Sequence, residues 1–364
     1  MHPAIRVLAL ALAAMFAALA QASEAPRENF ESDRFWLQPY EPTRAGVTSD
    51  NDDRTFLDVT LSVKMPLKVL DYMFEMPEFQ QRKSELFIAF TGRFSFYWFG
   101  RESSPIIGKR FNPKLAWRLT DRRETGFDSC ARAGDAPAVP PQAAGVFIEA
   151  RDYGSLPCGP IVRESYVELS YAHESNGQTV ASEAEYRVAQ EAALLKDGRI
   201  EYADDYISRG WDYLGLTYKP RPCEACENSR RRLSYYANLR YFLDRGVLQG
   251  RAEEWNDWEL FAARGKKRSE VNGIAVMAKL QGHTCMNDQG RPCAGAKVGD
   301  WKLVAGYETG HEKIFRHHTL RLEAGLQVLQ LPLSVWWQHG YANDLARYYL
   351  KGHSYGIGFD IGSF

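Results

Sequence analysis

Apolar and polar residues alternate along long stretches of this chain. Between residues 57 and 65 every second residue is apolar, and the residues between them are polar or charged. Because successive side chains of a β-strand point to opposite faces, this period of two predicts strands with one apolar and one polar face. The same alternation recurs at residues 86–98, 233–241, 274–280, 301–307, 320–328, 335–341 and 355–361.

The whole pattern predicts about twelve strands. They are longer than the usual strand of about 5–6 residues and close to the roughly 9–11 residues that a strand needs to cross a bilayer. Their expected positions are 35–41, 55–65, 85–99, 111–120, 161–175, 208–219, 232–243, 271–281, 300–311, 317–328, 333–342 and 353–364, with an acidic loop at 47–54. An even number of such strands is typical of a transmembrane β-barrel.

The polar faces of these strands carry Arg, Glu, Lys and Asp, which suits the wet interior of a membrane barrel. Aromatic residues gather near the predicted strand ends, where barrels carry girdles at the membrane interface. These residues are Trp98, Trp211, Trp301, Trp336, Trp337, Tyr348 and Tyr349. The predicted fold class is therefore all-β, a transmembrane antiparallel β-barrel of about twelve strands. A soluble β-sandwich with one solvated face is the alternative.

The first 22 residues have the organisation of a secretory signal peptide. Arg6 supplies a positive charge, an apolar run follows, and Ala20-Gln21-Ala22 is a small-x-small cleavage site. We exclude residues 1–22 from the fold, take residues 23–34 as an N-terminal arm, and assign residues 35–364 to the barrel. No other run is apolar enough for a spanning helix, so export and strand pattern together predict a multi-pass protein of the outer membrane.

The cysteines and the charge balance add two further constraints. A net charge of −1 gives no support for a nucleic-acid partner. Six cysteines in an exported chain suggest disulfides, with 15 possible pairings. Local pairing is the simplest, as Cys130–Cys158, Cys223–Cys226 and Cys285–Cys293, and places all three pairs on the periplasmic side. Cys130 and Cys158 fall in an Ala/Pro/Gly-rich stretch, residues 120–160, expected as an inserted periplasmic turn. A zinc or redox site at Cys223-x-x-Cys226 is the alternative.

The segment from Tyr171 to Gln178 combines residue types used in nucleophilic catalysis. His173 and Ser175 lie two residues apart at the end of a predicted strand, so their side chains share a face. A serine hydrolase needs a nucleophile, a base, and a third group that fixes the tautomer of the base. Asp212 has the apolar-face parity of the next strand and is the candidate for that role. The alternative is a simple polar strand end and turn.

These residues also carry a family resemblance. Tyr171-x-His173-x-Ser175-Asn176-Gly177, followed by Ser208-Arg209-x-Trp211, resembles the outer-membrane phospholipase A family, whose pattern is Y-x-H-x-S-N-G and then S-R-S-W-N. Upstream, Glu102-Ser103-Ser104-Pro105 resembles the E-S-S-P segment of that family. The resemblance implies a calcium-dependent serine hydrolase, active as a homodimer, that cleaves acyl esters of glycerophospholipids with phospholipase A1, phospholipase A2 and lysophospholipase specificities.

The resemblance also implies roles for individual residues. His173 is the expected general base, Ser175 the nucleophile, and Asp212 stands where the family has asparagine. The backbone N–H of Gly177 is expected in the oxyanion hole. The expected calcium ligands are the Ser208 side chain, the Gln178 carbonyl and, across the dimer interface, Ser103.

Two departures from the family leave other functions open. A carboxylate at position 212 on a lipid-facing surface is costly unless it is paired, and calcium and His173 are its expected partners. Residues 179–207 form a long extracellular loop, expected to be acidic and solvated, with a lid or added calcium ligands as alternatives. A non-catalytic channel or scaffold barrel with a degenerate site is the second hypothesis, and a soluble exported esterase is the third.

Overall fold

A computed structural model gives the arrangement of most of the chain. It describes residues 37–50, 54–76, 80–98, 106–127, 160–221, 231–254, 265–283, 298–328, 331–341 and 344–361. Ser103, all six cysteines, the expected signal peptide and the expected arm lie outside these residues, as does most of the expected periplasmic turn.

The described residues form mostly strands, with three short helical segments. The strands are β1 (Gln38–Pro39), β2 (Thr43–Asp50), β3 (Thr55–Met76), β4 (Gln80–Tyr97), β5 (Ile107–Phe127), β6 (Pro160–Ser175), β7 (Gly210–Lys219), β8 (Arg231–Phe242), β9 (Arg245–Gly246), β10 (Gly250–Arg251), β11 (Gly273–His283), β12 (Val298–Gly310), β13 (His318–Val328), β14 (Leu331–Gly340) and β15 (Gly352–Ile361). The helical segments are α3 (Glu183–Asp197), η4 (Ile200–Tyr206) and α4 (Arg268–Val271).

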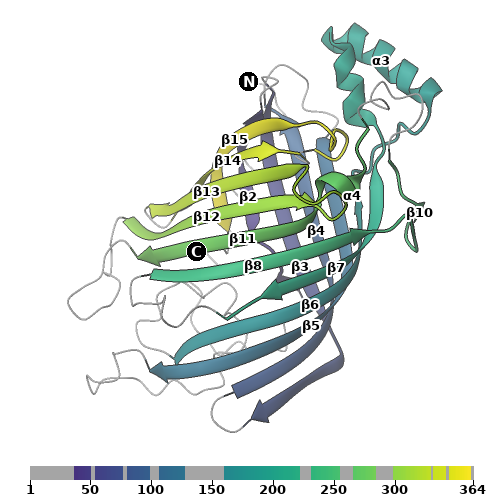
Figure 1. Ribbon diagram of the computed structural model, residues 1–364. Coiled ribbons are helices and arrows are strands. Elements are labelled where there is room, and N and C mark those ends of the chain that lie inside the picture. Colours follow the sequence, from purple (N-terminus) through teal and green to yellow (C-terminus); the bar gives the residue numbers. More distant parts are fainter. Residues whose placement is uncertain are drawn as a thin grey trace. The chain divides into compact units, whose positions relative to one another are not determined.

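Twelve of these strands close into one antiparallel barrel, which confirms the predicted fold class. Sequential strands pair with one another from β2 to β8 and from β11 to β15. β8 pairs with β11, and β15 pairs with β2 to close the ring. Figure 1 shows the long strands side by side in this wall. Closure gives each of the twelve strands a hydrogen-bonded neighbour on both sides, and backbone groups without partners are costly in a bilayer.

The two faces of the wall have opposite chemistry, as the alternation predicted. Leucines and other apolar side chains are exposed on the outer face, at Leu61, Leu115, Leu169, Leu216, Leu303 and Ile357. Charged and polar side chains are buried in the lumen, at Asp58, Lys64, Arg118, Glu168, Lys302 and Glu323. An apolar exterior around a polar interior is the pattern of a barrel that faces lipid. Among the described residues, no helix has the length and apolar character needed to cross a bilayer.

The first strand was predicted in the wrong place. In the described part of the expected strand 35–41, residues Gln38–Pro39 form β1 on β3, and the next strand, β2, occupies half of the expected loop 47–54. Pro42 lies between β1 and β2, which both pair with β3, and it has no N–H to donate to the ladder. Between these two strands Tyr40 and Glu41 turn to polar partners on other strands: Tyr40 donates to Glu168 at 2.6 Å, and Glu41 accepts from Lys114 at 3.1 Å.

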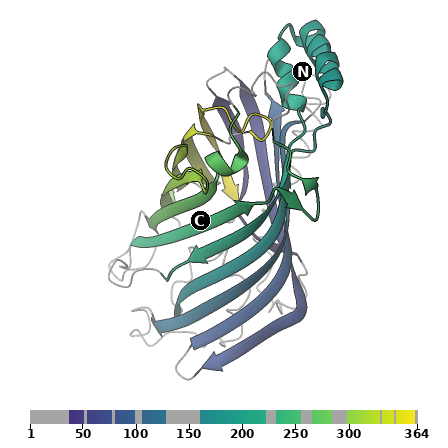
Figure 2. The ribbon, with the colours of Figure 1, turned by 45° about the vertical axis from the view of Figure 1, so that its right-hand side comes forward.

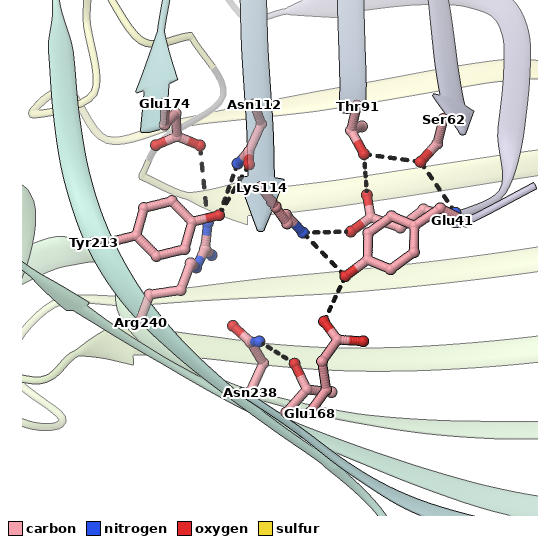
Figure 3. Close-up of polar contacts among 12 residues, drawn as sticks. Glu41, Ser62, Thr91, Asn112, Lys114, Glu168, Glu174, Tyr213, Asn238 and Arg240 are labelled. Carbon is pink, nitrogen blue, oxygen red and sulfur yellow. Dashed lines mark hydrogen bonds and ion pairs between the residues drawn. The ribbon is translucent and has the colours of Figure 1, made fainter. Parts of the chain in front are cut away.

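Polar side chains cross-link the lumen (Figure 3). Lys114 lies between Glu41 and Tyr40, with Thr91 donating to Glu41 at 3.0 Å. Farther along the wall Arg118 pairs with Glu168 at 2.8 Å, and both side chains are buried. Burial of these charges is tolerable because each has a partner of opposite sign.

The aromatic girdle prediction is wrong for several residues. Trp211, Tyr348 and Tyr349 are buried together in a cluster with Phe242 and Val271. The Tyr348 ring meets the Trp211 indole edge-on, at a centroid distance of 5.2 Å. Trp336 is also buried, with the Arg44 guanidinium 4.8 Å from its ring centroid. Trp98 and Trp337, in contrast, are exposed on the outer side.

The long segment between β6 and β7 is folded, which corrects the expectation of a solvated acidic loop. Helix α3 begins with a capping box: the Ser182 side chain accepts a hydrogen bond from the backbone N–H of Glu185, and the Glu185 side chain accepts one from the backbone N–H of Ser182. Tyr186, Ala193 and Tyr202 pack with Tyr97 of the barrel wall in an apolar cluster. Figure 2 shows α3 at one end of the barrel.

Two acidic residues of this segment are ion-paired instead of solvated. Asp204 and Asp205 are buried. The Arg347 guanidinium lies 3.1 Å from Asp205 and 4.0 Å from Asp204, and Tyr186 donates to Asp204 at 2.5 Å. These two acidic side chains therefore hold η4 through the Arg347 guanidinium.

Candidate active site

His173 and Asp212 lie directly opposite each other on neighbouring strands. The antiparallel register of β6 and β7 pairs His173 with Asp212 and Ser175 with Gly210. The Nδ1 atom of His173 is 2.6 Å from Oδ1 of Asp212. Since the carboxylate accepts a hydrogen bond, Nδ1 carries the proton, and Nε2 is left as the basic nitrogen. The structure therefore brings together the predicted base and its predicted partner.

Ser175 occupies the outward face of β6 two residues beyond His173. Tyr171, His173 and Ser175 alternate with buried Ala172 and Glu174, and the exposed Leu169 continues the outward face along the same strand. The three predicted catalytic side chains therefore project from the lipid-facing side of the wall, at the end of β6 that leads to α3.

Asp212 is buried although it belongs to the outer face. Its side chain is 1% exposed, against 18% for His173. Tyr171 donates its hydroxyl to Oδ2, and the backbone N–H of Leu248 donates to the same atom at 2.8 Å. The expected calcium partner is not needed to explain a carboxylate at this position, because hydrogen bonds and the imidazole satisfy both oxygens.

Gly177 has a conformation suited to a backbone donor. Its φ is +57°, in the left-handed region that glycine adopts without strain. A Cβ atom added there would lie 2.9 Å from the Phe111 ring. Any other residue would therefore be strained and crowded, and glycine allows this N–H to turn just after Ser175, the predicted nucleophile.

Asn176 joins the two ends of the α3–η4 insertion. Its side-chain amide donates to the carbonyl of Ile207 at 2.7 Å and accepts from the N–H of Arg209 at 2.9 Å and that of Gln178 at 3.3 Å. These contacts hold Ser208 beside the turn at Gly177. The Asn-Gly pair reads in sequence as a turn, and nothing in the alternation pointed to this bridging role.

Two of the expected calcium-binding positions lie near each other. The Ser208 hydroxyl donates to the Glu253 carboxylate at 2.9 Å. The backbone N–H of Val180 donates to the carbonyl of Tyr206, and the N–H of Ser208 donates to the carbonyl of Val180, so the chain just after Gln178 runs beside Ser208. Hydroxyl, carboxylate and carbonyl oxygens are the hard donors that calcium prefers. The described part of the chain holds no group of three or more His, Cys, Asp or Glu side chains placed for a metal. Ser208 and Glu253 therefore supply oxygen donors of the kind that calcium prefers, and the described residues alone do not assemble a complete metal site.

The end of β6 is also fixed from the lumen. Glu174, between His173 and Ser175, is fully buried and lies close to three guanidinium groups, of which Figure 3 shows that of Arg240. Arg110 donates to it at 2.6 Å, Arg268 at 2.8 Å, and Arg240 lies 3.9 Å away. These ion pairs therefore hold the end of β6 on the side opposite His173 and Ser175.

Residues 243–253, between β8 and α4, were missed by the sequence analysis. They fold back as a hairpin over the outer face of β7, with β9 paired to β10. Their short strands and mixed sequence carry no alternation, so the periodicity gave no signal. Glu254, at the end of this segment, accepts from Tyr348 at 2.6 Å, and burial raises the pKa of its carboxyl.

Fold and site together define a transmembrane β-barrel that carries a His–Asp pair and a neighbouring serine on its outer wall. No protein-family model matches the chain, and no curated protein matches its sequence.

Among solved structures, the chain is similar to outer membrane phospholipase A from Escherichia coli, with 15% identity and a TM-score of 0.47 over 90% of this chain and 98% of that one. It is also similar to a Salmonella typhi outer membrane phospholipase dimer with bound calcium, with 15% identity and a TM-score of 0.49 over 91% and 94% of the two chains. The β domain of the Bordetella autotransporter BrkA matches at 8% identity and a TM-score of 0.31, over 91% of this chain and all of that one (100%). These similarities concern barrel architecture alone, so a function has to be argued from the site.

Proposed function

We propose that this protein is a calcium-dependent phospholipase of the outer membrane that hydrolyses acyl esters of glycerophospholipids. The observation that carries the proposal is the 2.6 Å contact between His173 and Asp212 on the lipid-facing side of the barrel, with Ser175 on the same face. A nucleophile, a base and an orienting carboxylate are the three groups that acyl transfer needs. An ester at the membrane surface is the substrate that a lipid-facing site meets.

The residues of the chain account for the proton transfers. Ser175 Oγ attacks the ester carbonyl while Nε2 of His173 accepts the hydroxyl proton. The same nitrogen then returns the proton to the leaving alcohol, and the acyl-enzyme is hydrolysed by water in the reverse sense. Asp212 stays ionised and stabilises the imidazolium that forms in both steps.

The negative charge that develops on the ester oxygen needs hydrogen-bond donors. The N–H of Gly177, which follows the nucleophile at a positive φ, is the candidate in the chain. Bound calcium, held by Ser208, Gln178, Glu253 and Ser103 of a second copy, would add positive charge at that position. A homodimer is part of the proposal, because a site on an outer wall gains a second wall for its substrate from another barrel.

The lumen supports an enzyme over the alternative of an open channel. Polar contacts inside the lumen join the chain between β1 and β2 to distant strands: Glu41 pairs with Lys114 of β5, and Tyr40 donates to Glu168 of β6. An aqueous pore requires free space between such groups.

Fatty-acid release from phospholipid vesicles tests the proposal. Ser175→Ala should lower calcium-dependent release by roughly 1,000-fold or more, because no other group replaces the nucleophile. Ser165→Ala, toward the other end of β6, is the matched control and should keep full activity. Chelation with EDTA should lower release by the wild type. Undiminished release by Ser175→Ala would exclude the mechanism, and stable conductance in planar bilayers without hydrolysis would favour a channel.

A further inference from the structure

The outer face of β7 carries a second structural layer beside the catalytic pair. After β8 the chain reverses at residues 243–253, here called the clamp hairpin. Its base is bonded to the backbone of β7: the N–H of Leu243 donates to the carbonyl of Asp212 at 2.9 Å, and the N–H of Glu253 donates to that of Gly210 at 3.0 Å. These backbone hydrogen bonds therefore fix the position of the hairpin along β7, the strand that carries Asp212.

The tip of the clamp hairpin presents backbone donors to the catalytic groups. Val247 N–H donates to the hydroxyl of Tyr171 at 2.7 Å, and Leu248 N–H donates to Oδ2 of Asp212 at 2.8 Å. Tyr171 in turn donates its hydroxyl to Oδ2. Oδ2 thus receives two hydrogen bonds, and Oδ1 is left to His173. The carboxylate is held in one rotation about its own axis.

Gly246 allows the hairpin to approach so closely. A Cβ atom at this position would overlap the carboxylate and Cβ of Asp212. The overlapped group is short and buried, so it cannot give way as the end of a long side chain would. A second glycine, Gly210 of β7, also allows a close contact with the hairpin: a Cβ atom added there would lie 2.6 Å from the side-chain amide of Gln249. Gly210 is the register partner of Ser175.

We infer that the clamp hairpin is a positioning element of the catalytic site, in which Gly246, the N–H groups of Val247 and Leu248, and the Tyr171 hydroxyl fix the rotation of Asp212 against His173. This inference rests on the proposed function. It assigns a role to a segment outside the motifs that resemble the phospholipase family. A carboxylate has two equivalent acceptor oxygens, and donors that occupy one of them direct the other to the imidazole.

Removing the close approach tests the inference. Gly246→Ala should push Asp212 away from His173 and lower kcat/KM for vesicle phospholipid by about 100-fold, the usual cost of misplacing a catalytic group by about 1 Å. Gly306→Ala is the matched control, since the nearest atom to its added Cβ is Arg321 Cβ at 3.7 Å. Tyr171→Phe, which removes only a hydroxyl, gives a second variant that keeps the backbone unchanged.

The pH profile separates positioning from general damage. Without its carboxylate partner the imidazolium of His173 is less stable, so the acidic limb of kcat/KM should move to lower pH in Gly246→Ala and in Tyr171→Phe. A purely structural defect lowers kcat/KM at every pH and leaves the limb in place. Gly246→Ala should also cost little in an Asp212→Ala background, because the two changes act on one group. An acidic limb at the wild-type pH in both variants, together with additive effects of Gly246→Ala and Asp212→Ala on kcat/KM, would overturn the inference.

A readout independent of activity distinguishes this inference from the proposed function. In the ¹H NMR spectrum of the full chain in detergent micelles, the Nδ1 proton of His173 should resonate far downfield. It should be lost in Gly246→Ala and kept in Gly306→Ala. That result without any Ser175-dependent hydrolysis would uphold the clamp and refute the phospholipase. Ser175-dependent hydrolysis that is unaffected by Gly246→Ala would uphold the phospholipase and refute the clamp.

Discussion

Replacement of Glu174 by alanine should destabilise the barrel more than any surface charge change. The carboxylate is fully buried, and its oxygens lie 2.6 Å from Nε of Arg110 and 2.8 Å from Nη2 of Arg268. At an effective dielectric constant of about 20, opposite charges about 4 Å apart attract by roughly 4 kcal/mol. The desolvation of the carboxylate offsets part of this attraction, whereas its removal leaves the arginine charges without that partner.

The three arginines differ in how much they lose. The Arg110 side chain is 29% exposed and can be hydrated, and Arg240 keeps an ion pair with Glu308. Arg268 is fully buried, and two of its three guanidinium nitrogens already have no hydrogen-bond partner among the described residues. Most of the cost therefore falls on Arg268, and the free energy of unfolding should fall by about 3–5 kcal/mol.

Urea unfolding in lipid vesicles, followed by tryptophan fluorescence, measures this loss. Trp211 is a local reporter, because the Arg268 guanidinium lies 5.6 Å from its ring centroid. Combining Glu174→Met with Arg268→Met should recover most of the stability, since an apolar pair replaces a buried ion pair at little net cost. Glu183→Ala, in an exposed ion pair on α3, is the control and should cost below about 1 kcal/mol. Equal unfolding midpoints for Glu174→Ala and the wild type would refute this account.

Two further predictions concern helix α3. Ser182→Ala removes the N-cap and should lower the local stability of residues 183–197 by about 1 kcal/mol, seen as faster amide hydrogen exchange there but not in the barrel. The pKa of Glu185 is lowered by hydrogen bonds from the N–H of Ala181 and from Ser182. Its contribution is therefore present at neutral pH and lost as the pH falls through the lowered pKa, so the protection of the α3 amides, measured relative to their intrinsic exchange rates at each pH, should fall in acid. Unchanged exchange in either experiment would contradict the capping box as the start of the helix.

The barrel was predictable because its signal is distributed over many residues. Each spanning strand repeats an apolar and a polar position several times, so an error in one position does not change the strand. The first strand shows the limit: β2 reads Thr-Arg-Ala-Gly-Val-Thr-Ser-Asp, and its small and polar residues hide the alternation. The pairing of β2 with β15, at the far end of the sequence, gives it a place that no local pattern encodes.

The placement of the three candidate residues was predictable because parity and strand order suffice to place them. His173 and Ser175 share a face by spacing, and Asp212 shares it by position on the adjacent strand. The partners of Asp212 were not predictable in the same way. The Val247 and Leu248 contacts are made by backbone atoms, which every residue has, and the hairpin that brings them is irregular in sequence.

A second group of ion pairs in the lumen, formed by Arg44, Lys302, Glu323 and Asp360, bears on the order in which the barrel can assemble. Arg44 of β2, the first long strand, pairs with Asp360 of β15, the last one, at 2.5 Å and with Glu323 of β13 at 2.8 Å. Lys302 of β12 also pairs with Asp360. A chain that stops before β15 holds two of these cations inside with one carboxylate between them. Asp360 of the final strand supplies a second carboxylate for these two cations. The burial of Arg44 and Lys302 is therefore less favourable in a barrel that lacks β15, and pairing of β15 with β2 stabilises the closed ring.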